Sequence, residues 1–295
     1  MRNIFSKEKI VLSMVVAVSL ILCSNLSAFS FVACPESNET PLTDVGLYQV
    51  ESNQNPNQAF FSSAILFAAN IHGSIDNPTV YYNTADQAIL NSGQIAELKA
   101  KNINSQICYM PDHQAAGWSS LVSPQAAEQL ANEMVNDVVK YGADGINIDN
   151  EWCSGASNDY SMTMIAYYIK NNPNFRGKIL TINLTGTSLL NETWTPPGQT
   201  KPVVLKDYID DVYSMNYGEG ADSLQQYVNA GISKNNVYLG VEAGDQNVST
   251  DVKDLINDGY GGMMMYDIDD SSGSGDSTQW IQTAGSAAGM NVIKT

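Results

Sequence analysis

The sequence predicts one α/β domain, a (β/α)8 TIM barrel of eight parallel strands in which some strand–helix links are shortened. Three observations predict this fold. Short apolar runs alternate with longer stretches of helical period, as in chains that form parallel sheets. The alternation repeats eight times over about 250 residues, which is the usual size of such a barrel. Polar and aromatic residues also gather at the C-terminal ends of the runs, where these barrels carry their chemistry.

Each predicted strand is an apolar run bounded by turn-forming residues. The eight runs cover residues 45–50, 62–71, 105–110, 144–149, 178–184, 211–217, 236–241 and 261–268. The link between the first two is too short for a full helix. Residues 31–44 are polar and contain two prolines, so they are predicted as an N-terminal arm or linker. No repeat or domain break is evident beyond them, and residues 45–295 are predicted as one domain.

The clearest helical period follows the third predicted strand, at residues 123–142. Its apolar side chains recur at steps of three and four residues, Ser123 can cap its start, and Gly142 can end it. Weaker helical periods cover residues 84–101, 157–171, 221–231, 249–258 and 276–288.

Residues 1–30 are typical of an export signal. Basic residues within the first nine positions precede the apolar run IVLSMVVAVSLILC, and small residues follow at 28–30. The run is short and no stop-transfer pattern follows, so we expect a secreted protein, extracellular or periplasmic, with no stable membrane span. A competing interpretation makes Cys23 a lipid-anchored cysteine, although the bulky Leu22 before it disfavours such a site.

Composition limits the classes of partner. Hydrophobic residues make up 43% of the 295 residues and charged residues 15%, so a well-filled core is available. The net charge of −17 argues against nucleic acid and anionic membranes and suits a neutral, hydroxyl-rich substrate. No phosphate-binding glycine loop and no Ser/His/Asp elbow is present, so no cofactor is expected.

The cysteines leave two interpretations open. Beyond the export signal they are Cys34, Cys108 and Cys153. Cys108 and Cys153 lie near the ends of neighbouring predicted strands and could form a disulfide, or all three could be free thiols. Their spacing with the two histidines does not match a zinc site, so no metal is predicted.

The segment YGADGINIDNEW, residues 141–152, carries the strongest chemical signal. Alternate side chains of a strand share a face, so Asn147, Asp149 and Glu151 point one way while the intervening isoleucines point the other. Burying two carboxylates side by side is costly unless they share a proton or are hydrogen-bonded. A general acid kept protonated at neutral pH explains such an arrangement, and an exposed acidic strand end is the alternative.

DGINIDNEW resembles the D-G-x-D-x-D-x-E signature of glycoside hydrolase family 18. The chain resembles in particular the endo-β-N-acetylglucosaminidases of the endoglycosidase H and F type within that family. The similarity extends to AILFAANI, DHQAAGW, SPQAAEQLANEMVNDVVKYG and DGYGGMMMYDID, which occur in the corresponding order. It covers roughly residues 45–285 and is strongest over 60–152.

The resemblance implies a role for each matching residue. Glu151 takes the place of the general acid, and Asp149 that of the carboxylate that orients and stabilises the substrate's own 2-acetamido group. Tyr217, in SMNYG, matches the tyrosine that hydrogen-bonds the acetamide carbonyl, and Met215 is a floor residue. Such enzymes are retaining but use substrate assistance through an oxazolinium intermediate in place of a protein nucleophile.

Asn147 departs from the family pattern, which usually has aspartate there. Asparagine cannot share a proton with Asp149, but it can donate a hydrogen bond that favours the ionised carboxylate. We therefore expect the site geometry to survive with a shifted pH profile, and we predict Asn147 among the residues that contact substrate.

Five further residues are predicted at the barrel mouth or in contact with substrate because they lie near or just after the C-terminal ends of predicted strands: His113, Trp118, Trp152, Asn183 and Tyr266.

The predicted function is cleavage of the β-1,4 bond in the N,N'-diacetylchitobiose core of N-glycans by a secreted, monomeric glycosidase. Its partners are N-glycans on glycoproteins or other GlcNAc-containing oligosaccharides. One alternative is a chitinase acting on linear β-1,4-GlcNAc polymers with the same chemistry. Another is a catalytically weak glycan-binding barrel, suggested by Asn147.

Overall fold

The computed structural model describes residues 29–38, 40–52, 58–269 and 277–295. Nearly all of the expected export signal, including Cys23, lies outside the described residues. Within the described residues, no helix is long and apolar enough to cross a membrane.

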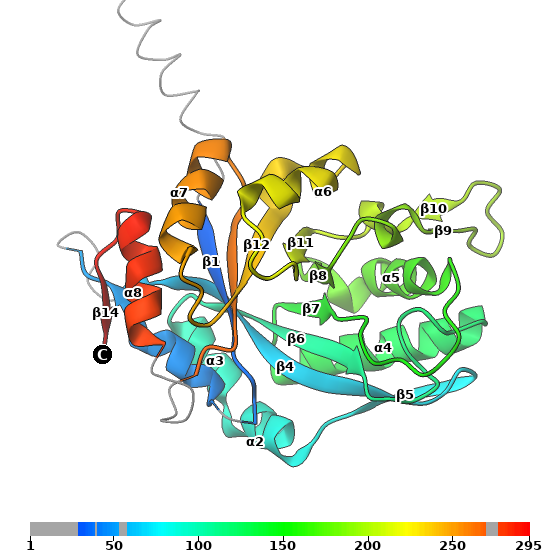
Figure 1. Cartoon of the computed structure of the whole chain (residues 1–295). Coiled ribbons are helices and arrows are strands. Elements are labelled where there is room, and N and C mark those ends of the chain that lie inside the picture. The colour runs from blue at the N-terminus through cyan, green and yellow to red at the C-terminus, as the bar shows by residue number, and fades with distance from the viewer. Residues whose placement is uncertain (1–28, 39, 53–57, 270–276) are drawn as a thin grey trace, which may run out of the picture.

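Eight parallel strands close into a barrel (Figure 1). They are β1 (Ser30–Cys34), β4 (Phe61–Ser74), β6 (Asn104–Pro111), β7 (Gly145–Ile148), β8 (Ile179–Leu184), β11 (Asp211–Ser214), β12 (Val237–Glu242) and β13 (Gly262–Tyr266). Closure comes from β1, which pairs with β13 on one side and with β4 on the other. The short strand β5 (Asn77–Tyr81) adds to β4 in antiparallel direction. The predicted TIM barrel is therefore confirmed.

The first strand of the barrel is not the predicted one. Residues 45–50 form most of a 3-10 helix, η1 (Leu42–Leu47), and then β2 (Tyr48–Val50). Strand β2 lies outside the barrel, in a small antiparallel sheet with β3 (Gln58–Ala59) and β14 (Val292–Lys294). The true first strand begins the segment that we expected to be a linker. It was missed because it has only five residues and ends at a proline, although four of the five are buried.

Helices surround the barrel. They are α2 (Thr84–Ser92), α3 (Gln94–Ala100), α4 (Pro124–Tyr141), α5 (Ser161–Asn171), α6 (Gln225–Asn229), α7 (Val248–Asp258) and α8 (Thr278–Ala287). Helix α4 begins and ends as predicted: Ser123 Oγ accepts from the Ala126 N–H at 3.1 Å, and Gly142 closes it with φ 77°. The predicted helix 84–101 is divided at Gly93, whose φ of 88° ends α2.

Some strand-to-strand links are shortened, as predicted. Between β8 and β11 the chain forms 3-10 turns, η3 (Leu189–Asn191) and η4 (Leu205–Asp207). A two-stranded hairpin of β9 (Thr193–Trp194) and β10 (Val203–Val204) lies between the turns and projects from the barrel in Figure 1. Between β1 and β4 the described residues form η1, β2 and β3, and no α-helix is among these elements.

The barrel has an apolar layer under the helices and a separate cluster inside. The inner cluster contains Cys34, Cys108, Tyr213, Tyr238 and Met264 together with two aliphatic residues. The three described cysteines are free: Cys34 and Cys108 are buried here, and Cys153 is half-buried in the loop after β7. The disulfide interpretation is wrong, and the free-thiol alternative holds.

Candidate active site

A cavity of about 240 Å³ opens at the C-terminal ends of the barrel strands. It brings together six of the residues that the sequence predicted for the site: Asp149, Glu151, Asn183, Met215, Tyr217 and Tyr266. They come from the ends of β7, β8, β11 and β13. Side chains from four separate strands therefore converge on one small pocket, the place where barrels of this class hold their chemistry.

Asp149 forms the buried wall of this pocket. Its residue is 1% exposed, and Oδ2 accepts a hydrogen bond from Asn183 Nδ2 at 3.1 Å. Burial raises the pKa of Asp149 to about 6; the Asn183 hydrogen bond opposes the rise, and the charge of Glu151 adds to it. The other carboxylate oxygen, Oδ1, has no hydrogen-bond partner among the described residues. That oxygen can accept a hydrogen bond from a ligand N–H.

Asn147 lies beneath Asp149 and is completely buried. Its Nδ2 donates to Thr181 Oγ1 at 2.9 Å and to Asn183 Oδ1 at 3.0 Å. The expected hydrogen bond from Asn147 to Asp149 is therefore indirect, since Asn183 stands between the two. The prediction that Asn147 contacts substrate is wrong, because the barrel interior covers it. Its role is to orient the amide that orients the carboxylate.

The polar network continues down to the barrel interior. The Thr181 hydroxyl donates to Gln106 Oε1 at 2.6 Å. Gln106 Nε2 donates in turn to Ser63 Oγ at 3.2 Å and to the Tyr213 hydroxyl at 3.1 Å. Buried polar groups must find partners, and these satisfy one another across four strands. Through Asn183 and Asn147, this network fixes the position of the Asp149 carboxylate.

Glu151 differs from Asp149 in exposure. It is two residues further along the same alternating segment and lies exposed at the pocket. One carboxylate is thus held inside the protein while the other can reach a ligand that enters from solvent.

Two tyrosines form the opposite wall. The rings of Tyr217 and Tyr266 stack with centroids 5.8 Å apart and planes at 21°, and Phe67 meets Tyr266 edge-on. Burial raises the pKa of both phenols, so both remain neutral donors at physiological pH. The Tyr266 hydroxyl donates to Glu36 Oε1 at 2.6 Å. Tyr217 is 36% exposed, and its hydroxyl has no hydrogen-bond partner among the described residues.

Three other predicted residues do not line the pocket. Trp118 is 0% exposed and donates from Nε1 to the Tyr109 carbonyl at 2.6 Å, so the prediction that it contacts substrate is wrong. Trp152 is 60% exposed, with its ring 5.5 Å from that of His113. Both have positive φ, at 61° and 54°, and the His113 N–H donates to the Trp152 carbonyl at 3.0 Å. Trp152 directly follows Glu151 in the chain, and His113 comes from the loop after β6.

Sequence reasoning missed four residues of the pocket: Cys34, Phe67, Thr185 and Met264. Two of them carried a usable signal. Thr185 is two residues after Asn183 and Met264 is two residues before Tyr266, so strand alternation places each on the face of a predicted residue. Cys34 could not be found, because its strand was assigned to a linker.

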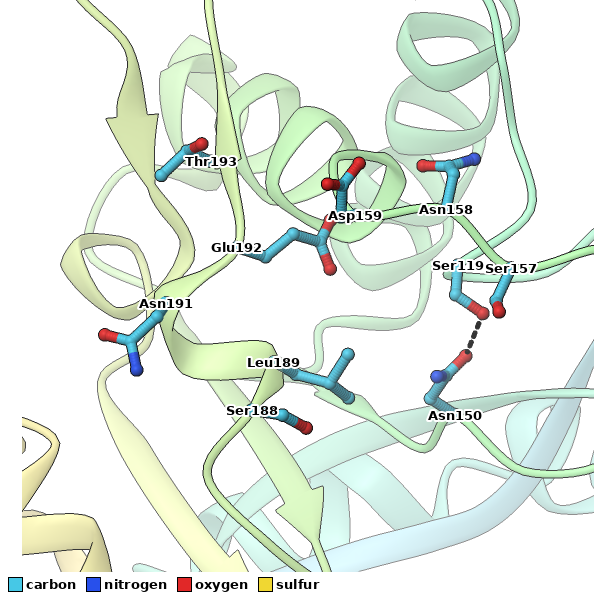
Figure 2. A pocket seen from close by; sticks show the side chains of 10 residues that line it. All are labelled: Ser119, Asn150, Ser157, Asn158, Asp159, Ser188, Leu189, Asn191, Glu192 and Thr193. Atoms are coloured by element: carbon cyan, nitrogen blue, oxygen red, sulfur yellow. Dashed lines mark hydrogen bonds between the residues drawn. The ribbon is translucent and has the colours of Figure 1, made fainter.

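A larger hollow of about 850 Å³ lies on the other side of the segment that follows β7 (Figure 2). Asn150 lines this hollow and accepts from Ser119 Oγ at 3.2 Å, whereas Asp149 and Glu151 line the smaller pocket. Glu192, seen in Figure 2 beside Asp159, accepts from the Thr163 N–H at 3.2 Å at the start of α5. Burial raises the pKa of Glu192 to about 7. Because its carboxylate caps a helix, we assign the chemistry to the smaller pocket.

Comparison with known proteins agrees with this geometry. Over 129 residues the chain is 35% identical to an endo-β-N-acetylglucosaminidase of Flavobacterium sp. (strain SK1022). The predicted resemblance is confirmed. The match spans 43% of this chain and 40% of the relative, so it covers less than half of that protein. No protein-family model matches the chain.

Solved structures share the barrel fold. EndoBT-3987 of Bacteroides thetaiotaomicron with a Man5GlcNAc product superposes with a TM-score of 0.70 at 20% identity, covering 90% of this chain and 62% of that one. A family GH18 chitinase from Pseudoalteromonas aurantia gives a TM-score of 0.55 at 13% identity, covering 88% of this chain and 99% of that one. The catalytic domain of a fern GH18 chitinase gives 0.62 at 17% identity, covering 87% and 99%.

Proposed function

We propose that this protein is an exported endo-β-N-acetylglucosaminidase that hydrolyses the β-1,4 bond between the two core N-acetylglucosamines of N-linked glycans. The observation that carries the proposal is that a buried Asp149 and an exposed Glu151 line one pocket together with Tyr217. Similarity to an endo-β-N-acetylglucosaminidase supports it.

In the proposed mechanism Glu151 donates its proton to the glycosidic oxygen as the bond to C1 breaks. The acetamide oxygen of the same sugar attacks C1 from the other side and forms an oxazolinium ring. Asp149 Oδ1, which has no hydrogen-bond partner among the described residues, accepts the acetamide N–H and stabilises the positive charge. The Tyr217 hydroxyl donates to the acetamide oxygen and aligns it. Glu151 then removes a proton from the water that opens the ring, so configuration at C1 is retained.

The pKa of Asp149 gives the pH dependence. The mechanism needs this carboxylate ionised, and burial raises its pKa to about 6. Activity should therefore fall as the pH drops through about 6.

A chitinase is the second candidate, since GH18 chitinases share the fold. Two features favour a glycan with a short core instead. Of the four tryptophans in the chain only Trp152, at 60%, is exposed, so no row of indole rings lines an extended groove. The pocket of about 240 Å³ is also smaller than the roughly 300–1,000 Å³ of most ligand sites, which suits a single sugar ring.

The test is incubation of the mature chain with a high-mannose glycoprotein, followed by mass spectrometry. High-mannose glycan is the first choice because EndoBT-3987 was crystallised with Man9GlcNAc2Asn. Release should leave one N-acetylglucosamine on asparagine, and Glu151→Gln should abolish it. Asn150→Ala is the matched control, since Asn150 lies between the two carboxylates but faces the other hollow. Cleavage of chitin oligomers alone would favour the chitinase, and binding without cleavage a glycan-binding barrel.

A further inference from the structure

A carboxylate stands behind the aromatic wall of the pocket, on the segment that follows β1. Glu36 forms an isolated parallel bridge with Phe67 of β4. The Ser37 N–H donates to the Phe67 carbonyl at 2.9 Å, and the Asp267 N–H donates to the Cys34 carbonyl at 3.0 Å. The backbone around Glu36 is therefore attached to β4 on one side and to the end of β13 on the other.

The side chain of Glu36 holds Tyr266. The bond from the Tyr266 hydroxyl to Glu36 Oε1, at 2.6 Å, has the length of a charge-assisted O–H···O⁻ bond. Phe67 contacts Tyr266 edge-on, with centroids 5.6 Å apart. Tyr266 thus has its hydroxyl bonded to Glu36 and its ring in T-shaped contact with Phe67, and one face of the ring packs on Tyr217.

That ring face supports Tyr217. The two rings stack at 5.8 Å, and Tyr217 lies in the loop after β11, where its N–H donates to the Met215 carbonyl at 2.9 Å. With its hydroxyl unpartnered and its side chain partly exposed, Tyr217 depends on this stack for its orientation. An aromatic pair of this kind contributes about 0.5–1.5 kcal/mol beyond the area it buries.

We propose that Glu36 is a positioning residue for the proposed hydrolysis. Glu36 accepts the hydrogen bond of the Tyr266 hydroxyl and so fixes the Tyr266 ring, on which the Tyr217 ring stacks. The Tyr217 hydroxyl is thereby held where it can donate to the acetamide oxygen of the substrate. Glu36 does not line the pocket and contacts no reacting atom. Its loss misaligns the acetamide oxygen during attack while leaving the rest of the glycan bound, so kcat falls and KM stays nearly constant. This inference rests on the proposed function.

A double-mutant cycle tests the connection. Glu36→Ala and Tyr266→Phe should each lower kcat about tenfold, the rate equivalent of one hydrogen bond, with KM within about twofold. The double variant should be no slower than either single variant, because both remove the same bond. Glu36→Gln keeps an acceptor oxygen and should retain most of the activity.

A matched control separates the hydrogen bond from simple loss of charge. Glu242 is another carboxylate near Tyr217, and it makes no hydrogen bond to Tyr266. Glu242→Gln should leave kcat within about twofold of wild type, since it changes the charge but not the anchor. A loss equal to that of Glu36→Ala would overturn the positioning role.

A second readout does not need activity. In protein labelled at tyrosine, the Tyr217 ring resonances, assigned through Tyr217→Phe, should move in Glu36→Ala but not in Glu242→Gln. Failure of wild type to cleave any glycan would refute the proposed function, and the resonances would still decide the connection. The inference would be overturned if the Tyr217 resonances did not move in folded Glu36→Ala. It would also be overturned if the losses of kcat in Glu36→Ala and Tyr266→Phe were additive in the double variant.

Discussion

Replacing Asn147 by aspartate gives the most direct test of how the buried network controls Asp149. The substitution puts a second carboxylate two residues along the same strand face, where alternate residues are about 6.6 Å apart. At an effective dielectric constant of about 20, two charges at that distance repel by about 2.5 kcal/mol. This corresponds to about 1.8 pKa units. The sign is upward, because a nearby negative charge disfavours the ionised form of Asp149.

The expected result is an acidic limb that moves from about pH 6 to higher pH in the profile of kcat/KM. The two carboxylates would titrate as a pair, so the limb reports the pair and not one residue. The assay is glycan release across the pH range, with the melting temperature measured at each pH to follow folding.

Asn147→Leu is the control. Both substitutions remove the hydrogen bonds donated to Thr181 and Asn183, but only aspartate adds a charge. If the limb moves equally in the two folded variants, the loss of donors is responsible and the charge argument fails. An unmoved limb in a folded Asn147→Asp variant would refute the reasoning altogether.

Two further predictions concern stability and thiol reactivity. Burial raises the pKa of Glu192 from 4.5 to about 7, so wild type should lose stability as the pH rises through that window. The free energy of unfolding of Glu192→Gln should therefore exceed that of wild type at pH 8 by about 3 kcal/mol, at about 1.4 kcal/mol per pKa unit, and should nearly equal it at pH 4. Destabilisation at both pH values would contradict this. In the mature chain, Cys153 should react with a thiol reagent in the native state, whereas the buried Cys34 and Cys108 should react only after unfolding. All three should react in denaturant with no reductant added, and a smaller number of reactive thiols would indicate a disulfide.

Most of the barrel could be predicted from the sequence, because seven of its strands are apolar runs separated by helical periods or turns. Strand β1 could not. It is short and stops at Pro35, and its burial depends on pairing with β13 and β4, which are distant in the sequence. The sequence offered a local signal, since residues 31–34 are all apolar, but this run is only four residues long and directly follows the expected export signal. The longer run at residues 45–50 took its place in the prediction.

In the site, the position of Asp149 and Glu151 on one face could be predicted, because the alternation of side chains along a strand depends only on neighbouring residues. Trp118 shows the limit of that reasoning. It follows a strand end, but the loop folds back and buries its ring against the strand it left. The hydrogen bonds that Asn147 makes beneath Asp149 also could not be predicted, because their acceptors and the partners of those acceptors, such as Thr181 and Gln106, come from other strands.

The closure of the barrel by β1 ties the earliest part of the domain to the latest. Phe31 pairs with Met263, and Phe31 also pairs with Phe61. A chain that emerges with its N-terminus first can form the pairing with β4 early, but it cannot close the ring until β13 has emerged. Contacts between such distant residues slow folding and leave strand edges uncovered meanwhile. The pocket is lined by Cys34 of β1 and by Met264 and Tyr266 of β13, so it cannot be complete before β13 is in place.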